Sequence, residues 1–268
     1  MTELSQSRSE GPPGSGGEFP GPSAESEPEP AAWPPTSAGW GPTEILMGIG
    51  LFLVLLLLGS AIAQVADGSS GSDQRSGTLI TLQAFTAIAF VLSAFLVVGP
   101  ARATLGKLGL GRTLAKRVNL GELKIPAPLA YGIAAIVIHG AFSLVRGALI
   151  HPEQDDIPDN LGYDSSTIGN VAIGFLIVIA APISEEIFFR GFMFAGIRSR
   201  ANIVVAALIS SIFWGALHYS GSDTWGAVVQ LSVFGLVLCW TYEKTGSIRT
   251  TIAIHAINNA IAFAYLVS

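Results

Sequence analysis

Two adjacent carboxylates and a guanidinium interrupt an apolar stretch of this sequence, Ala180-Ala-Pro-Ile-Ser-Glu-Glu-Ile-Phe-Phe-Arg-Gly. An ionisable group at membrane depth costs roughly 2.5–3.5 kcal/mol even on insertion scales, so such groups indicate function. Glu186 and Arg190 stand four residues apart with the acid first, which is the favourable order for a helical ion pair. Successive residues lie about 100° apart around a helix, so Glu185 faces elsewhere. Glu185 is then desolvated and available as a general base.

Two further apolar runs carry polar residues that lipid would penalise. His218 ends one run, and His255 is followed four residues later, on the same helical face, by Asn259. If the two histidines and the asparagine converge on Glu185, the set can hydrolyse an amide. A partly desolvated carboxylate can activate water, and imidazole and amide groups can donate hydrogen bonds to a developing oxyanion.

The same residues also admit a metal ion. Glu185, His218 and His255 would supply three protein ligands and leave a fourth position open, as a catalytic Zn²⁺ requires. The sequence contains no His-Glu-x-x-His motif, which would place two ligands on one helical face. A zinc site and a metal-free glutamate mechanism therefore both stay open.

Chain lengths indicate which of these groups can meet. The chain is expected to turn near Ser199, and Glu185 lies about fourteen residues before this turn and His218 about nineteen after it. At about 1.5 Å per residue these positions are ~21 and ~28 Å from the turn, so an antiparallel hairpin places them side by side. His255 lies only about seven residues, or ~10 Å, beyond the connection near Ser247, and residue counting leaves open whether it reaches the same depth.

The composition is that of a membrane protein. Of the 268 residues, 50% are hydrophobic and only 12% are charged, whereas soluble domains carry about 25% charged residues. Seven apolar runs are each close to the ~20 residues that a helix needs to cross the hydrocarbon. We therefore expect an all-α fold, a multi-pass transmembrane bundle of about seven spanning helices. The runs are 44–66, 78–99, 127–150, 168–189, 201–219, 224–242 and 248–267.

Composition also divides the chain. Residues 1–43 are rich in Pro, Gly, Ser and Glu and are expected to form a disordered tail, because they cannot bury enough apolar surface to fold. Trp33 and Trp40 in this segment are expected to be tail residues without a role, in preference to the alternative that they touch the membrane interface. Residues 44–167 are expected to form N-terminal transmembrane helices and loops, and residues 168–268 the catalytic core.

The charges of the connections predict an orientation. Lys and Arg gather in some connections and Asp and Glu in another, and positive charge marks the cytoplasmic side. The N-terminus is accordingly expected to be cytoplasmic, in an integral multi-pass protein of a bacterial plasma membrane. The basic connections are 100–126, 190–200 and 243–249, and the acidic one is 151–167.

Pro182 lies inside an apolar run, three residues before Glu185. It removes one backbone hydrogen bond and is expected to kink the helix. Free backbone groups at membrane depth are tolerated beside a wet cavity, so the kink and the carboxylates together suggest a polar cavity. Small residues throughout the runs should let helices approach closely. They are Gly132, Ala134, Ala135, Gly140, Ala206, Ala207, Gly215 and Gly235.

Each of these features also has a structural interpretation. The Glu186–Arg190 pair can serve packing alone, and His139, in the middle of the run at 127–150, is expected to be a structural histidine bonded to a backbone carbonyl. Asn258 either packs between helices or supports Asn259. The aromatic trio after the glutamates is expected to face lipid or to pack; it comprises Phe188, Phe189 and Phe192.

The ordered motifs resemble those of a known family. Glu-Glu-x-x-x-Arg, then an aromatic residue followed four residues later by His, then His-x-x-x-Asn, resembles the CPBP family of CAAX proteases and bacteriocin-processing enzymes, also called the Abi family. The resemblance covers about residues 168–268. Trp214 stands where this family usually has Phe, and the larger ring is expected to change the shape of the pocket without loss of the chemistry.

The resemblance implies roles for the matching residues. Glu185 would activate water, Glu186 with Arg190 would orient the site, and Asn259 would be an oxyanion donor. His218 and His255 are the histidines of the second and third motifs. The family was first described as metalloproteases, and a metal-free glutamate mechanism is also argued for it.

Together these features predict an intramembrane endopeptidase, a hydrolase that cleaves a membrane-associated substrate with glutamate-activated water. A prenylated CAAX-type protein is one candidate substrate by analogy. The expected partners are a membrane-anchored protein or peptide and the lipid bilayer, with no nucleic acid. The alternative is a non-catalytic membrane protein, either a proton-coupled transporter or a degenerate family member that acts as a binding or immunity partner. The absence of repeated halves disfavours a transporter.

Overall fold

The structure is a computed structural model that describes residues 38–66, 72–99, 117–120, 123–150, 167–219 and 225–266. These residues belong to one unit, Ala32–Ser268. Its α-helices are α1 (Pro42–Ala66), α2 (Ser72–Val98), α3 (Ala127–Ile150), α5 (Thr167–Phe175), α6 (Ala181–Glu186), α7 (Ala195–Arg198), α8 (Ile203–Ala216), α9 (Trp225–Thr245) and α10 (Ile248–Leu266). Two π-helices, η1 (Leu176–Ala180) and η2 (Ile187–Phe194), and two strands, β1 (Arg117–Leu120) and β2 (Leu123–Pro126), complete the described elements.

Five of the described helical segments are long and apolar enough to cross a membrane, which confirms an all-α, multi-pass membrane protein. They are Pro42–Val65, Thr78–Val98, Ala127–Leu149, Thr167–Arg198 and Trp225–Thr245. The other two predicted spans are also helical. However, α8 has 14 residues, or ~21 Å, which is less than the ~30 Å of hydrocarbon, and α10 carries several polar residues among its 19. For α8 and α10, spanning stays a prediction.

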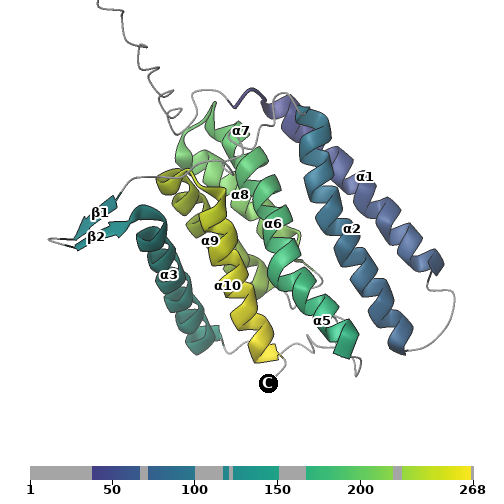
Figure 1. Cartoon of the computed structure of the whole chain (residues 1–268). Helices are drawn as coiled ribbons and strands as arrows, with labels where there is room; N and C mark the ends of the chain where they lie inside the picture. Colours follow the sequence, from purple (N-terminus) through teal and green to yellow (C-terminus); the bar gives the residue numbers. More distant parts are fainter. Residues whose placement is uncertain are drawn as a thin grey trace, which may run out of the picture. The chain divides into compact units, whose positions relative to one another are not determined.

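The helix that carries the glutamates lies at the centre of the bundle (Figure 1). It runs without interruption from Thr167 to Arg198 through α5, η1, α6, η2 and α7. Helix α2 packs along one side of it and α10 along another, while α8 packs against both η2 and α9. Helix α1 pairs with α2, and α3 packs against α9 and α10. Three helices distant in sequence thus surround the two glutamates.

One small sheet departs from the all-α expectation. Strands β1 and β2 pair antiparallel, with Val118 opposite Ile125, in the segment that the sequence assigns to a polar connection. The remainder of that basic connection, residues 100–116, lies outside the described residues, and so do the acidic connection at 151–166 and residues 1–37 of the predicted tail.

Trp40 contradicts the expectation that it has no structural role. Its side chain is buried, and its indole nitrogen donates a hydrogen bond to the carbonyl of Phe192 at 2.8 Å. The carbonyl of Trp40 in turn accepts a hydrogen bond from Arg200. The segment before α1 is therefore held against η2 and α7. A tryptophan in a Pro- and Gly-rich stretch gives no sign of such a contact until its partner helix is placed.

An aromatic cluster forms the core beneath the glutamates. Phe188, Phe189 and Phe192 are each fully buried, so the packing alternative is correct for this trio and the lipid-facing one is wrong. Phe90 of α2 stacks on Phe52 of α1 with ring centroids 4.2 Å apart, and it lies 5.2 Å from Phe188. This cluster fixes α1 and α2 against η2.

Glycines allow α8 and α9 to pack closely. A Cβ added at Gly215 would lie 2.7 Å from the carbonyl oxygen of Val228, and one added at Gly235 would lie 2.9 Å from the Cβ of Ser211. The expectation that small residues permit close helix approach is confirmed at these two positions. It is wrong at Gly140, where nothing lies within 4 Å of an added Cβ.

Gly215→Ala is therefore expected to destabilise the protein by about 1–3 kcal/mol, because the new methyl group meets backbone that cannot move aside. Gly140→Ala is the matched control and is expected to be neutral or slightly stabilising, since alanine favours helix. Thermal unfolding in detergent micelles measures both. Equal midpoints for the two variants would contradict the close approach of α8 and α9.

Candidate active site

Glu186 and Arg190 form the predicted ion pair. The Arg190 Nη1 atom lies 2.8 Å from Glu186 Oε1, and both side chains are fully buried. The Arg190 guanidinium also lies over the ring of Trp214, with its Cζ 4.8 Å from the ring centroid. The pair is thus enclosed by protein, where its hydrogen bonds are not shared with solvent.

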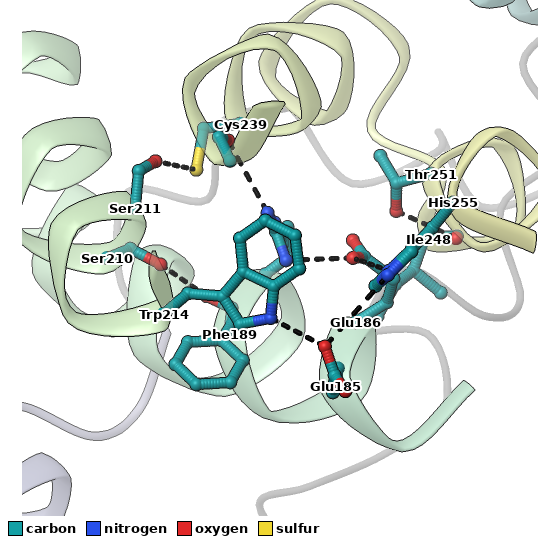
Figure 2. Close-up of polar contacts among 12 residues, drawn as sticks. Glu185, Glu186, Phe189, Ser210, Ser211, Trp214, Cys239, Ile248, Thr251 and His255 are labelled. Atoms are coloured by element: carbon teal, nitrogen blue, oxygen red, sulfur yellow. Dashed lines mark hydrogen bonds and ion pairs between the residues drawn. The ribbon is translucent and has the colours of Figure 1, made fainter. Parts of the chain in front are cut away.

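Glu185 points away from this pair, as the helical geometry predicts. Figure 2 shows the indole nitrogen of Trp214 and the ring of His255 both directed at its carboxylate. Trp214 Nε1 donates a hydrogen bond to Glu185 Oε2 at 2.5 Å, and His255 Nε2 lies 4.0 Å from the same oxygen. Within the described residues, no protein donor bonds to the other oxygen, Oε1.

His255 lies between the two glutamates. Its Nδ1 atom is 3.0 Å from Glu186 Oε1. An ionised carboxylate can only accept, so Nδ1 carries a hydrogen and donates it. In the neutral ring, Nε2 then holds a lone pair and faces Glu185.

The depth of His255, which residue counting left open, follows from the turn before α10. Thr245, Ser247 and Ile248 are all buried, so this turn lies inside the protein. Gly246 takes a φ of 61° there, a conformation that residues with a Cβ rarely adopt. Because α10 starts inside the bundle, seven residues suffice to bring His255 to Glu186.

His218 comes from the predicted hairpin, which the structure confirms. Helix α7 ends at Arg198 and α8 begins at Ile203, after an N-cap in which Asn202 accepts a hydrogen bond from the Val205 backbone N–H at 3.0 Å. His218 Nδ1 lies 3.0 Å from the carbonyl oxygen of Trp214. A carbonyl only accepts, so Nδ1 donates and Nε2 is left as an acceptor in the neutral ring.

Two cavities meet at Glu185. One of about 310 Å³ extends toward α10, and one of about 270 Å³ extends toward α1 and α2. Both are lined by Gln83, Glu185, Trp214 and His218, and the first is also lined by His255 and Asn259. The sequence-predicted residues that could touch a substrate, Glu185, His218, His255 and Asn259, therefore all line the first cavity, whose wall is otherwise mostly apolar.

Asn259 is held by a backbone group that Pro182 leaves unpaired. At the end of η1 the N–H of Ala181 donates to the carbonyl of Leu176, five residues back. The next carbonyl, that of Ile177, would pair in the same register with residue 182, where proline has no N–H. Asn259 Nδ2 supplies the donor at 2.9 Å. Nδ2 carries a second hydrogen, which remains for a ligand in the cavity.

Asn259→Ala is expected to destabilise the protein by about 1–3 kcal/mol, since it leaves the Ile177 carbonyl without this donor. Asn258→Ala is the control, because Asn258 contributes only a long hydrogen bond of 3.4 Å to Asn259 Oδ1. That bond agrees with the expectation that Asn258 supports its neighbour. Denaturant unfolding of both variants measures the difference, and an equal loss would contradict the role of the Ile177 carbonyl.

The described side chains do not fit a three-ligand metal site. No group of three or more His, Cys, Asp or Glu within the described residues is placed to hold a metal ion. Glu185 and His255 approach each other, but His218 does not complete a ligand set with them. The zinc alternative is thus not supported by the arrangement of these three residues.

His139 lies apart from this site. It is buried in α3, with its ring 4.3 Å from that of Phe234. Its Nδ1 atom has no hydrogen-bond partner among the described residues. The expectation of a packing residue fits this position, whereas a backbone-carbonyl bond is not seen at Nδ1.

Comparison with known proteins identifies the part of the chain that carries the site. Residues 167–261 match the family described as type II CAAX prenyl endopeptidase Rce1-like. Over these residues the chain is similar to this family, which supports the resemblance to the CPBP family that its motifs indicated. The matched segment holds all six predicted site residues, from Glu185 to Asn259. Helices α1 and α2, which line the second cavity, precede it.

One curated relative is the uncharacterized protein YyaK of Bacillus subtilis (strain 168). It is 32% identical over 120 residues, which are 41% of this chain and 38% of the relative. The match therefore spans about two fifths of the length of that relative. No solved structure matches the chain significantly.

Two features of the candidate site were not predicted from the sequence. Trp214 was expected only to change the pocket shape, whereas its N–H donates to Glu185. Gln83 of α2 was not identified, although it lines both cavities. A lone amide in the apolar run at 78–99 is the signal that could have found it.

Proposed function

We propose that this protein is an intramembrane endopeptidase that hydrolyses a peptide bond of a membrane-associated substrate with water activated by Glu185. The observation that carries the proposal is the position of Glu185. Its carboxylate lies where two cavities meet, with His218, His255 and Asn259 around the same space. The match of residues 167–261 to a family of prenyl endopeptidases supports the same activity.

The proposed mechanism gives each group a role that its position supports. A water molecule beside Glu185 can donate one hydrogen to the carboxylate and the other to Nε2 of His218, because both are acceptors that line one cavity. Glu185 takes the proton as the water oxygen attacks the substrate carbonyl. The free hydrogen of Asn259 Nδ2 stabilises the oxyanion. Glu185 then returns the proton to the leaving nitrogen as the C–N bond breaks.

Glu186, Arg190 and His255 position this machinery. The buried ion pair fixes Glu186, and Glu186 accepts from His255 Nδ1. His255 is thereby held with Nε2 beside Glu185. A fixed arrangement of this kind accelerates a reaction because orientation is settled before the substrate arrives.

The substrate and the location belong to the same proposal. A protein or peptide anchored in the bilayer fits a site placed among apolar helices, and a prenylated CAAX-type protein is the candidate that the family suggests. The basic connections favour a cytoplasmic N-terminus, and the relative in Bacillus subtilis favours a bacterial plasma membrane.

The test is cleavage of a library of membrane-anchored peptides by the purified, detergent-solubilised protein, with products identified by mass spectrometry. Cleavage within the peptide that depends on Glu185 supports the proposal. Equal cleavage by wild type and Glu185→Gln would overturn the role of Glu185, whereas no cleavage by either protein would favour the non-catalytic alternative. A parallel reaction with a chelator separates the two mechanisms, since a metal-free reaction is insensitive to it.

A further inference from the structure

Trp214 closes a ring of contacts around the candidate site. It belongs to α8 and is fully buried. Its indole nitrogen donates to Glu185 at 2.5 Å, and its ring face receives the Arg190 guanidinium. Arg190 pairs with Glu186, Glu186 accepts from His255, and His255 faces Glu185 (Figure 2).

We infer that Trp214 is a positioning residue for Glu185: its Nε1–H fixes Oε2 and thereby directs Oε1 of the carboxylate at the water. The expected effect on the reaction rests on the proposed function. The hydrogen bond between Trp214 and Glu185 does not depend on that proposal. No motif spacing in the sequence assigns a hydrogen-bonding role to this position.

The bond from Trp214 is of the strong type. A hydrogen bond to an ionised acceptor is shorter and about twice as strong as one between neutral groups, and the bond from Trp214 Nε1 to the Glu185 carboxylate is of this type. One oxygen of the carboxylate is therefore occupied. Rotation of Glu185 about its terminal bond would break this contact, so the second oxygen keeps a defined direction.

The indole is itself held on several sides. The rings of His218 and His255 each lie 5.3 Å from it in edge-on contact, and Phe234 lies 6.0 Å away. Arg190 covers one face at 4.8 Å, a distance at which a cation is attracted to the ring. The indole cannot turn away from Glu185 without displacing these groups.

Trp214 links Arg190 of the buried ion pair to Glu185. The Arg190 guanidinium covers the indole ring, and the indole N–H donates to Glu185 Oε2. Glu186 holds Nδ1 of His255, whose Nε2 lies 4.0 Å from the same oxygen, beyond hydrogen-bond distance. The direction of the Glu185 carboxylate therefore depends on the bond from Trp214.

The contact is tested directly by NMR of the full-length protein in detergent micelles, with ¹⁵N-labelled tryptophan. The chain has five tryptophans, and Trp214→Phe assigns the signal of Trp214 by its loss. We expect the indole N–H proton of Trp214 to resonate downfield of the others and to return to their range in Glu185→Ala. A Trp214 signal at the same position in wild type and Glu185→Ala would overturn the inference.

The effect on the reaction is tested with kinetics. Trp214→Phe keeps an aromatic ring but has no N–H, and its kcat is expected to fall about tenfold to a hundredfold with KM within about twofold. Trp240→Phe is the matched control. Trp240 of α9 packs against Tyr131 of α3 and lines neither cavity. The four remaining indole signals of Trp214→Phe check that the variant is folded.

The outcomes separate this inference from the proposed function. If Trp214→Phe and Trp240→Phe have the same kcat while Glu185→Gln is inactive, the positioning role is wrong and the proposed function stands. If wild type and Glu185→Gln are equally active, the proposed function is wrong, and the position of the Trp214 signal decides alone whether the contact with Glu185 exists.

Discussion

Glu185→Gln is expected to lower the kcat for peptide-bond cleavage about 10²–10⁴-fold, the range that a general base contributes. Glutamine has almost the same shape, and its carbonyl oxygen can still accept the hydrogen bond from Trp214. It cannot take a proton from water. The fold should therefore survive the substitution while the reaction does not, and the unfolding midpoint should stay close to that of wild type.

Glu243→Gln is the matched control for this measurement. Glu243 is also a partly buried glutamate, but it pairs with Arg198 at 2.9 Å between α9 and α7 and lines neither cavity. Its loss should leave kcat unchanged. A similar fall in kcat for both variants would show that Glu185→Gln lowers activity by disturbing the fold and not by removing the base that activates water.

Arg190→Met is expected to cost about 3–5 kcal/mol of stability, because it leaves the carboxylate of Glu186 buried without its cationic partner. Loss of one partner is expected to cost less stability in an ion pair that is partly exposed to solvent. Arg198→Met, which breaks the pair with the partly exposed Glu243, should cost about 1 kcal/mol or less. Denaturant unfolding in micelles compares the two.

A double variant separates the charge from the packing. Glu186→Gln with Arg190→Met removes both charges at similar volume, and buried pairs replaced in this way often keep their stability. We expect the double variant to recover most of the stability that Arg190→Met loses. If it is as unstable as the sum of its single variants, the cost lies in packing around Trp214 and not in an unpaired charge.

Several features of the fold were predictable because they depend on local pattern alone. Seven apolar runs predicted seven helical segments, and each run is helical in the structure. The spacing of Glu186 and Arg190 predicted their ion pair, since residues four apart in a helix are neighbours whatever surrounds them. The turn near Ser199 was predictable from its flanking charges.

The chemistry of the candidate site was predictable in part. Motif residues identify which side chains are involved, and residue counting brings His218 level with Glu185. Counting left the depth of His255 open, because it measures depth only from a turn that lies at the surface. The turn before α10 is buried, and only packing of the whole bundle decides where a turn lies.

The amino-acid sequence by itself determined the helices, the buried ion pair and the set of polar residues, because each depends on hydrophobicity or on spacing along one element. Tertiary structure alone decided how those residues are partnered. The bond from Trp214 to Glu185 joins α8 to α6, and the bond from Asn259 to Ile177 joins α10 to η1. Contacts between helices depend on their relative depth and rotation, and no spacing within a single helix contains that information.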